Sequence, residues 1–274
     1  MATTRGGADG ERSRLLEELG QGQHRIPSLL RGLGPALVAR DQLSLLYQPR
    51  IDMQSGHCLS AEALLRWQHP ILGKVPPDEF IPLIERNGMI RFVTDWVVER
   101  ALAEWSSQPE PVRPRRVSIN ISPLNLGEAN FASRLSEAIA RYGLQPRCVE
   151  LELTETALLH DSEPMTKAAH DLTALGIGIA IDDFGKGYSN LAYLRETPAT
   201  TVKIDQSFIR PLCESRRDRI IVQSMIRLTH DLGYRVVAEG IENRDIYDML
   251  AEWGCDEGQG FHISHPVPIG ALDE

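Results

Sequence analysis

The sequence has few cysteines, no long apolar run and no recognisable export signal. Its four cysteines stand far apart and form no Cys-x-x-Cys pair, which fits reduced thiols better than a disulfide framework or a zinc site. No apolar run approaches the length of a membrane span, and residues 1–22 contain no apolar core of a signal peptide. We therefore expect a cytoplasmic protein that does not bind a membrane.

Basic residues are also in deficit. Lysine and arginine together number 29 against 38 aspartates and glutamates, so the net charge is −9. Loose binding to a nucleic-acid polymer or to an anionic membrane requires clustered basic side chains, and both partners are disfavoured. The P-loop pattern and the His-Glu-x-x-His pattern of zinc proteases are absent as well. An anionic substrate would have to meet positive charge from a metal ion or from a few placed basic residues.

The stretch from Gly178 to Tyr188 is the most informative part of the chain. Its alternate isoleucines predict a strand that is buried on both faces and ends in Asp182 and Asp183. Adjacent carboxylates at the edge of an apolar core are unfavourable unless cations or donors compensate them, so the pair suggests a metal site. The alternative is that Asp182 ends a strand and Asp183 caps the next turn.

Strands and helices alternate along residues 26–274, after a tail at 1–25 that we expect to be disordered or to form a short helix. A chain of 274 residues can form an α/β barrel of roughly 250 residues. About eight strand-helix repeats predict a parallel sheet, and their regularity favours a closed barrel. The expected strands are 43–51, 59–67, 116–121, 149–154, 178–183, 201–204, 235–238 and 258–263. The expected helices are 26–40, which Pro35 should kink or break, 77–86, 91–106, 130–142, 164–175, 191–195, 217–232 and 246–253.

Seven polar side chains stand in or at the end of different predicted strands, where a core would favour Val or Ile. In a (β/α)8 barrel the C-terminal strand ends converge on one mouth, which holds the active site. A single member has a simpler explanation, such as a surface ion pair between Glu62 and Arg66, but independent surface residues would not keep this register in seven strands. The seven residues are Glu62, Asn120, Glu152, Asp182, Lys203, Glu239 and Gln259.

These residue types indicate a chemistry. Four carboxylates and an amide oxygen form an all-oxygen ligand set that suits Mg²⁺ or Mn²⁺ and disfavours zinc. The adjacent Asp182 and Asp183 can hold two such ions, an arrangement that serves phosphodiester cleavage. Lys203, surrounded by carboxylates, would stay charged and orient a water or stabilise developing charge. We therefore expect a two-metal phosphodiesterase site at the barrel mouth.

Short motifs follow one another along residues 43–268 in a specific order. They are Tyr47-Gln48-Pro49, Glu62-Ala63-Leu64, Glu79-Phe80-Ile81-Pro82-Leu83, Asn120-Ile121-Ser122, Glu152-Leu153-Thr154-Glu155, Asp182-Asp183-Phe184-Gly185, Lys203-Ile204-Asp205, Val237-Ala238-Glu239-Gly240-Ile241-Glu242 and Gly258-Gln259-Gly260. Together they resemble the EAL-domain cyclic di-GMP phosphodiesterases. The resemblance implies a modified TIM (β/α)8 barrel whose first strand runs antiparallel, with hydrolysis of cyclic di-GMP to linear pGpG.

The resemblance also implies a ligand set. Glu62, Asn120, Glu152 and Asp182 match ligands of a first metal ion. Asp182 would bridge to a second ion that Asp183 and Glu239 help to hold. The implied cofactors are two Mg²⁺ or Mn²⁺ ions.

The remaining matches concern catalysis and substrate binding. Lys203 resembles the residue that contacts the nucleophilic water, and Gln259 one that hydrogen-bonds water or metal. Glu155 resembles the glutamate that anchors the loop after the fifth strand, and Glu242 a second acidic position near the metals. These four complete an expected catalytic set with Glu62 and Glu239. The expected substrate contacts are Gln48, Arg66 and Asp205. The guanidinium group of Arg66 suits a pair of phosphate oxygens.

Some positions depart from the family pattern. Lys186 and Asn190 replace a usual threonine and serine in a loop that couples metal binding to dimerisation in the family, and we expect a homodimer here. Arg50 stands where an aliphatic residue is usual, and His262 and His265 occupy late positions that are usually apolar or aromatic and basic. We expect Lys186 to be exposed and to change mainly the apparent metal requirement.

Three functional hypotheses remain open. We favour an active phosphodiesterase, because every matched metal ligand is present. The second is a non-catalytic receptor that binds cyclic di-GMP or a protein partner. The third is a two-metal barrel that cleaves another phosphodiester.

Overall fold

The computed structural model describes residues 25–38, 41–109, 114–155, 157, 163–187, 194 and 197–272. The predicted tail lies almost wholly outside these residues, as do Asn190 and most of the predicted helix at 191–195. The chain divides into two compact units, one formed by Met1–Ser44 and Arg66–Val93 and the other by Leu45–Leu65 and Thr94–Glu274.

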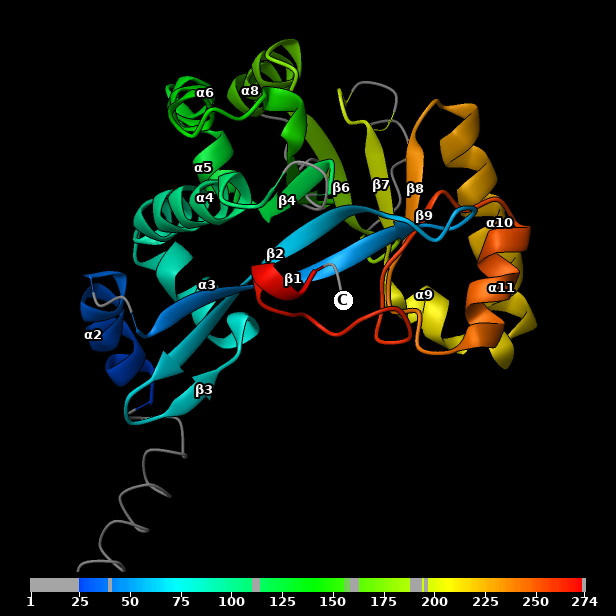
Figure 1. Ribbon diagram of the computed structural model, residues 1–274, viewed down its shortest axis with the longest axis horizontal. Coiled ribbons are helices and arrows are strands. Elements are labelled where there is room, and N and C mark those ends of the chain that lie inside the picture. The colour runs from blue at the N-terminus through cyan, green and yellow to red at the C-terminus, as the bar shows by residue number, and fades with distance from the viewer. Residues whose placement is uncertain are drawn as a thin grey trace, which may run out of the picture. The chain divides into compact units, whose positions relative to one another are not determined.

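In the second unit, eight strands of the described residues form a closed ring (Figure 1). They are β1 (Leu43–Asp52), β2 (Cys58–His69), β4 (Arg116–Asn120), β5 (Val149–Thr154), β6 (Gly178–Phe184), β7 (Thr201–Ile204), β8 (Arg235–Ala238) and β9 (Glu257–Gly258). Strands β2 and β4 to β9 pair in parallel in that order, whereas β1 pairs antiparallel with β9 and also pairs with β2. The prediction of a modified TIM barrel with an antiparallel first strand is confirmed.

Helices follow the strands along the chain, most of them close to the predicted positions, whereas the two short helices at Pro123–Leu126 and Gln206–Ile209 were not predicted. The helices are α4 (Ile90–Ser106), α5 (Pro123–Leu126), α6 (Phe131–Arg141), α8 (Glu163–Ala174), α9 (Gln206–Ile209), α10 (Arg216–Asp231) and α11 (Arg244–Glu252), with 3-10 turns at Pro146–Cys148, Arg210–Cys213 and Ile269–Ala271. Side-chain caps mark the starts of α10 and α11: the Ser215 hydroxyl accepts from the Asp218 amide at α10, and the Asn243 side chain accepts from the Ile246 amide at α11. None of the helices in the described residues is long and apolar enough to span a membrane.

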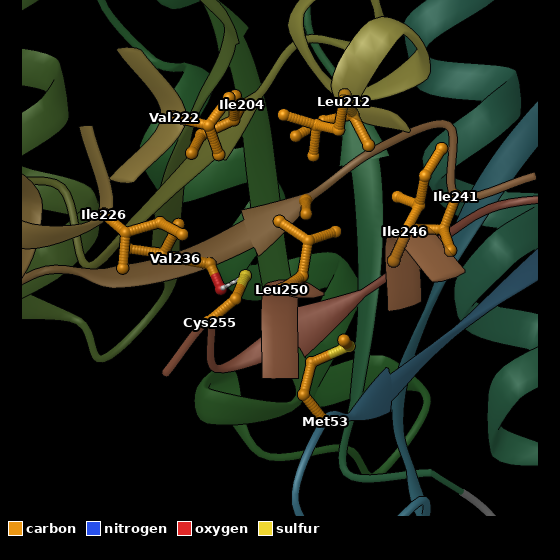
Figure 2. Packing of buried hydrophobic residues seen from close by; sticks show 12 residues of the cluster. Met53, Ile204, Leu212, Val222, Ile226, Val236, Ile241, Ile246, Leu250 and Cys255 are labelled. Atoms are coloured by element: carbon orange, nitrogen blue, oxygen red, sulfur yellow. Dashed lines mark hydrogen bonds between the residues drawn. The ribbon is translucent and has the colours of Figure 1, made fainter. Parts of the chain in front are cut away.

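An apolar core joins β7 and β8 to the helices that cover them (Figure 2). The helices contribute Ile226 and Leu250 to it, while the strands contribute Ile204 and Val236. The Cys255 thiol lies in the same core and donates to the Val236 carbonyl at 3.6 Å. This core packs on the outer face of the two strands. Their stability therefore does not depend on apolar side chains inside the ring, and the inward side chains can be polar.

The first unit contains α2 (Arg25–Val38), β3 (Gly73–Val75) and α3 (Pro77–Arg86). Of the two predicted effects of Pro35, a kink or a break, the break is wrong, because Pro35 lies inside α2; the kink stays a prediction. Strand β3 was not predicted, and it pairs antiparallel with the end of β2. Trp67 packs edge-on against Phe80, with ring centroids 5.2 Å apart.

The last predicted strand, 258–263, is wrong after its first residue. Strand β9 ends at Gly258, and the amides of Ile263 and Ser264 both donate to the Gly260 carbonyl in a turn. A Cβ atom at Gly260 would collide with the backbone of Ile241, so the chain turns where only glycine fits. The alternating apolar and polar residues of this segment imitate a strand.

Candidate active site

The strands present polar side chains to the inside of the ring in two layers. Successive residues of a strand point to opposite faces, so residues two apart share a face. In β5 these are Glu150 and Glu152, both fully buried, and in β7 they are Thr201 and Lys203. The residue nearer the C-terminal end of each parallel strand belongs to a mouth layer. The other belongs to an inner layer, which comprises Arg50, Ser60, Ser118, Glu150, Thr201 and Glu257.

Lys203 lies at the centre of the mouth layer. Its ammonium nitrogen is 2.6 Å from Glu152, 2.7 Å from Glu239, 3.1 Å from Asp182 and 3.5 Å from Glu62. These four side chains, which come from four different strands or strand ends, are named the carboxylate cluster below. Thus five of the seven polar residues predicted at strand ends meet around one nitrogen.

The remaining two strand-end residues are amides that orient Glu62. Asn120 Nδ2 donates to Glu62 Oε1 at 2.7 Å, and Gln259 Nε2 donates to Glu62 Oε2 at 2.8 Å. Gln259 Nε2 also donates to Gln48 Oε1 at 3.1 Å, and Gln48 Nε2 donates to the Ser264 carbonyl. The side-chain amide oxygen of Gln259, Oε1, is buried and has no hydrogen-bond partner. An orphaned buried acceptor of this kind can receive a cation or a water.

Burial and crowding control protonation in the cluster. Burial raises the pKa of Glu152 and Asp182, and it raises that of Glu239 to about 7, because ionisation adds negative charge where water is excluded. Burial also acts to raise the pKa of Glu62, but the Lys203 ammonium and the amide donors outweigh it, so this pKa is lowered. Burial disfavours the Lys203 cation, but the four carboxylates dominate and raise its pKa. The cluster therefore keeps Lys203 charged, while burial on balance opposes ionisation of three of its four carboxylates.

Asp182 and Asp183 point to different partners despite their adjacency. The register between β6 and β7 shifts between Ile181 and Phe184, and bulges of this kind re-aim side chains near active sites. Among the described non-glycine residues, Asp183 alone has a positive φ, of 56°. Asp182 faces Lys203, whereas the Asp183 carboxylate accepts from Lys186 at 2.8 Å.

The loop after β6 is held from below by Glu155. This buried glutamate accepts from the Gly185 amide at 2.9 Å and from the Gly187 amide at 3.3 Å. A Cβ at Gly187 would press against the Glu155 carboxylate, so glycine permits the close approach. The contact is the kind of loop anchor that the sequence led us to expect.

Lys186 is half-exposed, and its ammonium forms ion pairs with two aspartates. Its ammonium lies 2.8 Å from Asp183 and 2.8 Å from the buried Asp205, and these hydrogen bonds and charges raise its pKa although partial burial opposes them. Asp205 also caps α9, where it accepts from the Ser207 amide. Lys186 is thus as exposed as expected, but it already neutralises a predicted metal ligand.

The comparison with known proteins decides the family. Residues 31–266 match the sequence model of the EAL domain. The chain belongs to the EAL-domain family. The cyclic di-GMP phosphodiesterase PA2567 of Pseudomonas aeruginosa is 42% identical over 259 residues, which are 93% of this chain and 44% of that protein. NbdA, a cyclic di-GMP phosphodiesterase of the same organism, is 41% identical over 85% of this chain and 30% of its own length. The EAL domain therefore spans less than half the length of these curated relatives.

Solved structures of similar sequence share the fold. The PaMucR phosphodiesterase in complex with cyclic di-GMP superimposes with a TM-score of 0.83 at 36% identity, over 89% of this EAL domain and 99% of that chain. The EAL enzyme Bd1971 in its cAMP-bound form gives a TM-score of 0.84 at 30% identity, over 97% of this EAL domain and 74% of that chain.

The mouth of this EAL domain has the donor set for a hard divalent cation. Within the described residues, no group of three His, Cys, Asp or Glu side chains is placed to hold a metal ion, and the Lys203 ammonium lies among the four carboxylates of the cluster. The donors themselves are oxygens: the carboxylate cluster, the Asn120 amide and the orphaned Gln259 Oε1. Oxygen ligands of this type suit Mg²⁺ or Mn²⁺, so the chemistry of the donor set fits these ions.

Some predicted site residues are not gathered at the cluster. Glu242 is half-exposed and pairs with Arg210 at 2.8 Å. Both Asp205 oxygens have partners within the protein, so its predicted substrate contact stays a prediction. Arg66 belongs to the first compact unit, and its role as a substrate contact is also untested.

Sequence reasoning missed the role of Arg50. This residue was noted only as a departure, yet it is fully buried and bonded to Glu150, Glu152 and Glu257. A signal was available, since Glu150 and Glu152 alternate in an apolar strand and must share its inward face. Two buried glutamates on one face require a buried cation nearby.

Proposed function

We propose that this EAL domain hydrolyses cyclic di-GMP to linear pGpG with the help of two Mg²⁺ or Mn²⁺ ions. The observation that carries the proposal is the convergence of Glu62, Glu152, Asp182 and Glu239 around Lys203 at the C-terminal mouth of the barrel. The names of PA2567 and NbdA support the substrate assignment. The cyclic di-GMP complex of PaMucR supports binding at such a domain.

The carboxylates and amides of the mouth would hold the ions. Glu62, Asn120, Glu152 and Asp182 are proposed for the first ion, and Asp182, Asp183 and Glu239 for the second. When bound, the ions polarise the phosphodiester and supply a hydroxide-like water at neutral pH. Asn120 and Gln259 fix both oxygens of Glu62, so this carboxylate is oriented before any ligand arrives.

Lys203 would provide the positive charge closest to the reacting groups. Its ammonium is buried and kept charged by four carboxylates. An ammonium in a water-excluded site can donate to the attacking water or to the phosphate oxygen that gains charge, with little reorganisation. The water oxygen then bonds to phosphorus as the 3′-oxygen leaves, which opens the ring and gives a linear dinucleotide.

The substrate would be gripped from the rim of the mouth. Gln48 is proposed as one contact. Its side-chain amide is hydrogen-bonded to Gln259 and to the Ser264 backbone carbonyl, which places it close to the carboxylate cluster. Arg66 is proposed as a second contact, to a phosphate oxygen.

The proposal also includes a homodimer in the cytoplasm, which light scattering of the purified protein and fractionation of cells can test.

The decisive experiment incubates the purified protein with cyclic di-GMP and Mg²⁺ or Mn²⁺ and identifies the nucleotides produced. We expect pGpG from the wild type and none from Glu62→Gln, which removes a ligand charge without changing side-chain size. Glu252→Gln, at an exposed position on α11, serves as the matched control and should keep full activity. Full turnover by a stable Glu62→Gln protein contradicts the proposed mechanism. Binding of cyclic di-GMP without turnover at any metal concentration would show a receptor instead.

A further inference from the structure

Arg50 is the cation of the inner layer, and it is completely buried. Its Nε atom donates to the Ser60 hydroxyl at 2.7 Å and lies 3.3 Å from Glu257 Oε2. Its Nη2 atom donates to Glu150 Oε1 at 2.5 Å. Its Nη1 atom donates to Glu152 Oε1 at 3.1 Å. The guanidinium therefore uses its whole fork, and one arm reaches into the mouth layer.

The two inner glutamates have other cations as well. Arg116 lies 3.4 Å from Glu150 Oε2 and 2.9 Å from Glu257 Oε1, and Arg235 lies 3.2 Å from the same Glu257 oxygen. Arg116 is partly exposed, so it approaches these acids from the outer end of the inner layer. Compensation of the inner acids thus does not depend on Arg50 alone.

The contact with Glu152 differs in kind. Glu152 is fully buried, and its two oxygens are divided between two cations: Oε1 accepts from Arg50 and Oε2 accepts from Lys203 at 2.6 Å. A carboxylate held at one oxygen by a rigid planar group cannot rotate freely about its terminal bond. The other oxygen is then directed toward the centre of the carboxylate cluster.

We infer that Arg50 is a positioning residue, which orients Glu152 from inside the barrel so that one of its oxygens is presented to a divalent cation at the mouth. The inference rests on the proposed function only in that Glu152 is taken as a metal ligand. Partners that orient a ligand typically change metal affinity by about 10–100-fold when they are removed. Arg50 is completely buried, and of the carboxylate cluster it contacts Glu152, so its effect should pass through metal affinity.

Two matched substitutions test this. Arg50→Lys keeps the charge, but a single ammonium cannot replace the planar fork that bonds Glu150, Glu152 and Ser60 together. Arg116→Lys makes the same chemical change at a residue that forms ion pairs with two acids of the inner layer, Glu150 and Glu257. Mn²⁺ affinity is measured by calorimetry and by the loss of free-ion paramagnetic resonance signal, without nucleotide. We expect Arg50→Lys to weaken Mn²⁺ binding by about tenfold or more, and Arg116→Lys to stay close to the wild type.

A second Arg50 variant covers loss of folding. If Arg50→Lys unfolds, the pair Arg50→Gln with Glu150→Gln removes one charge of each sign from the inner layer and leaves Glu152 without its guanidinium. Thermal unfolding is recorded for every variant. In a folded variant, the inference predicts weaker Mn²⁺ binding, with kcat restored toward the wild-type value at saturating Mn²⁺.

The outcomes separate this inference from the proposed function. Unchanged Mn²⁺ affinity in a folded Arg50 variant overturns the inference, and so does an equal loss of affinity in Arg116→Lys. A wild type that binds Mn²⁺ but does not cleave cyclic di-GMP overturns the proposed function. The Mn²⁺ affinities of the Arg50 and Arg116 variants still test the role of Arg50 in that case. A wild type that binds no Mn²⁺ overturns both.

Discussion

Replacement of Lys186 by threonine should lower the metal concentration that the proposed hydrolysis of cyclic di-GMP needs. The Lys186 ammonium lies 2.8 Å from Asp183, which is proposed to hold the second ion. The ammonium and the ion require the same carboxylate, so they compete for it. Lys186→Thr removes the competitor and restores the residue that is usual in the family loop.

The structure limits the size of this effect. Lys186 and Asp183 are 49% and 38% exposed, and an ion pair so open to solvent is worth about 1 kcal/mol or less. Lys186 can keep its second partner, the buried Asp205, when it gives up Asp183. Only one pair is therefore lost on metal binding, and 1 kcal/mol corresponds to about a fivefold change in affinity. We expect Lys186→Thr to need up to about fivefold less Mg²⁺ for half-maximal rate.

The assay is a titration of initial rate against Mg²⁺ at saturating cyclic di-GMP. Lys186→Met, which keeps most of the side-chain stem without its charge, separates electrostatics from loop packing. The difference from the wild type should shrink at high salt, because exposed charges are screened. An equal or greater Mg²⁺ requirement in Lys186→Thr would refute the competition. A wild type that is inactive at every Mg²⁺ concentration beside an active threonine variant would mean that Lys186 has made this domain a receptor.

Three other residues give sharp tests. Lys203→Met should lower kcat by about a hundredfold or more while cyclic di-GMP affinity changes little; equal losses in rate and affinity would assign Lys203 to substrate binding. Burial raises the pKa of Glu239 to about 7, so below that pH a proton must leave before a cation can bind, and Mn²⁺ affinity should fall by up to about tenfold per pH unit toward acid. Calorimetry from about pH 5.5 to about pH 8 checks this, and a flat profile contradicts it. Burial raises the pKa of Cys255 to about 12, so a thiol reagent should modify exposed Cys213 first and Cys255 only after unfolding.

The strand-end carboxylates were predictable because they break a strong rule. A strand buried on both faces rarely carries a charge, so Glu152 and Asp182 stand out in runs of apolar residues. Parallel strands of a barrel end at the same mouth, and this places side chains together that lie far apart in the sequence. The fold class and the membership of Lys203 in the cluster follow from these two regularities.

Other features depend on contacts that no local pattern contains. The Arg50 interactions join residues about a hundred positions apart, and only the closed ring brings Arg50 to Glu150. The turn at Gly260 is imposed by the backbone of Ile241 against which it packs. The pairing of Lys186 with Asp183 requires the bulge that turns Asp183 away from Lys203.

Stability alone does not account for the ionic interior of the barrel. Barrels of this class usually fill the corresponding positions with Val, Ile and Leu. Desolvation of buried charges offsets most of their attraction, and apolar replacements of such clusters are often neutral or stabilising. Here Arg50 links Glu150 to Glu152, and Lys203 links Glu152 to Glu239, so one connected network runs from the inner layer to the mouth. Such a network fixes each carboxylate through its neighbours, which is what a metal site requires and what an apolar core cannot supply.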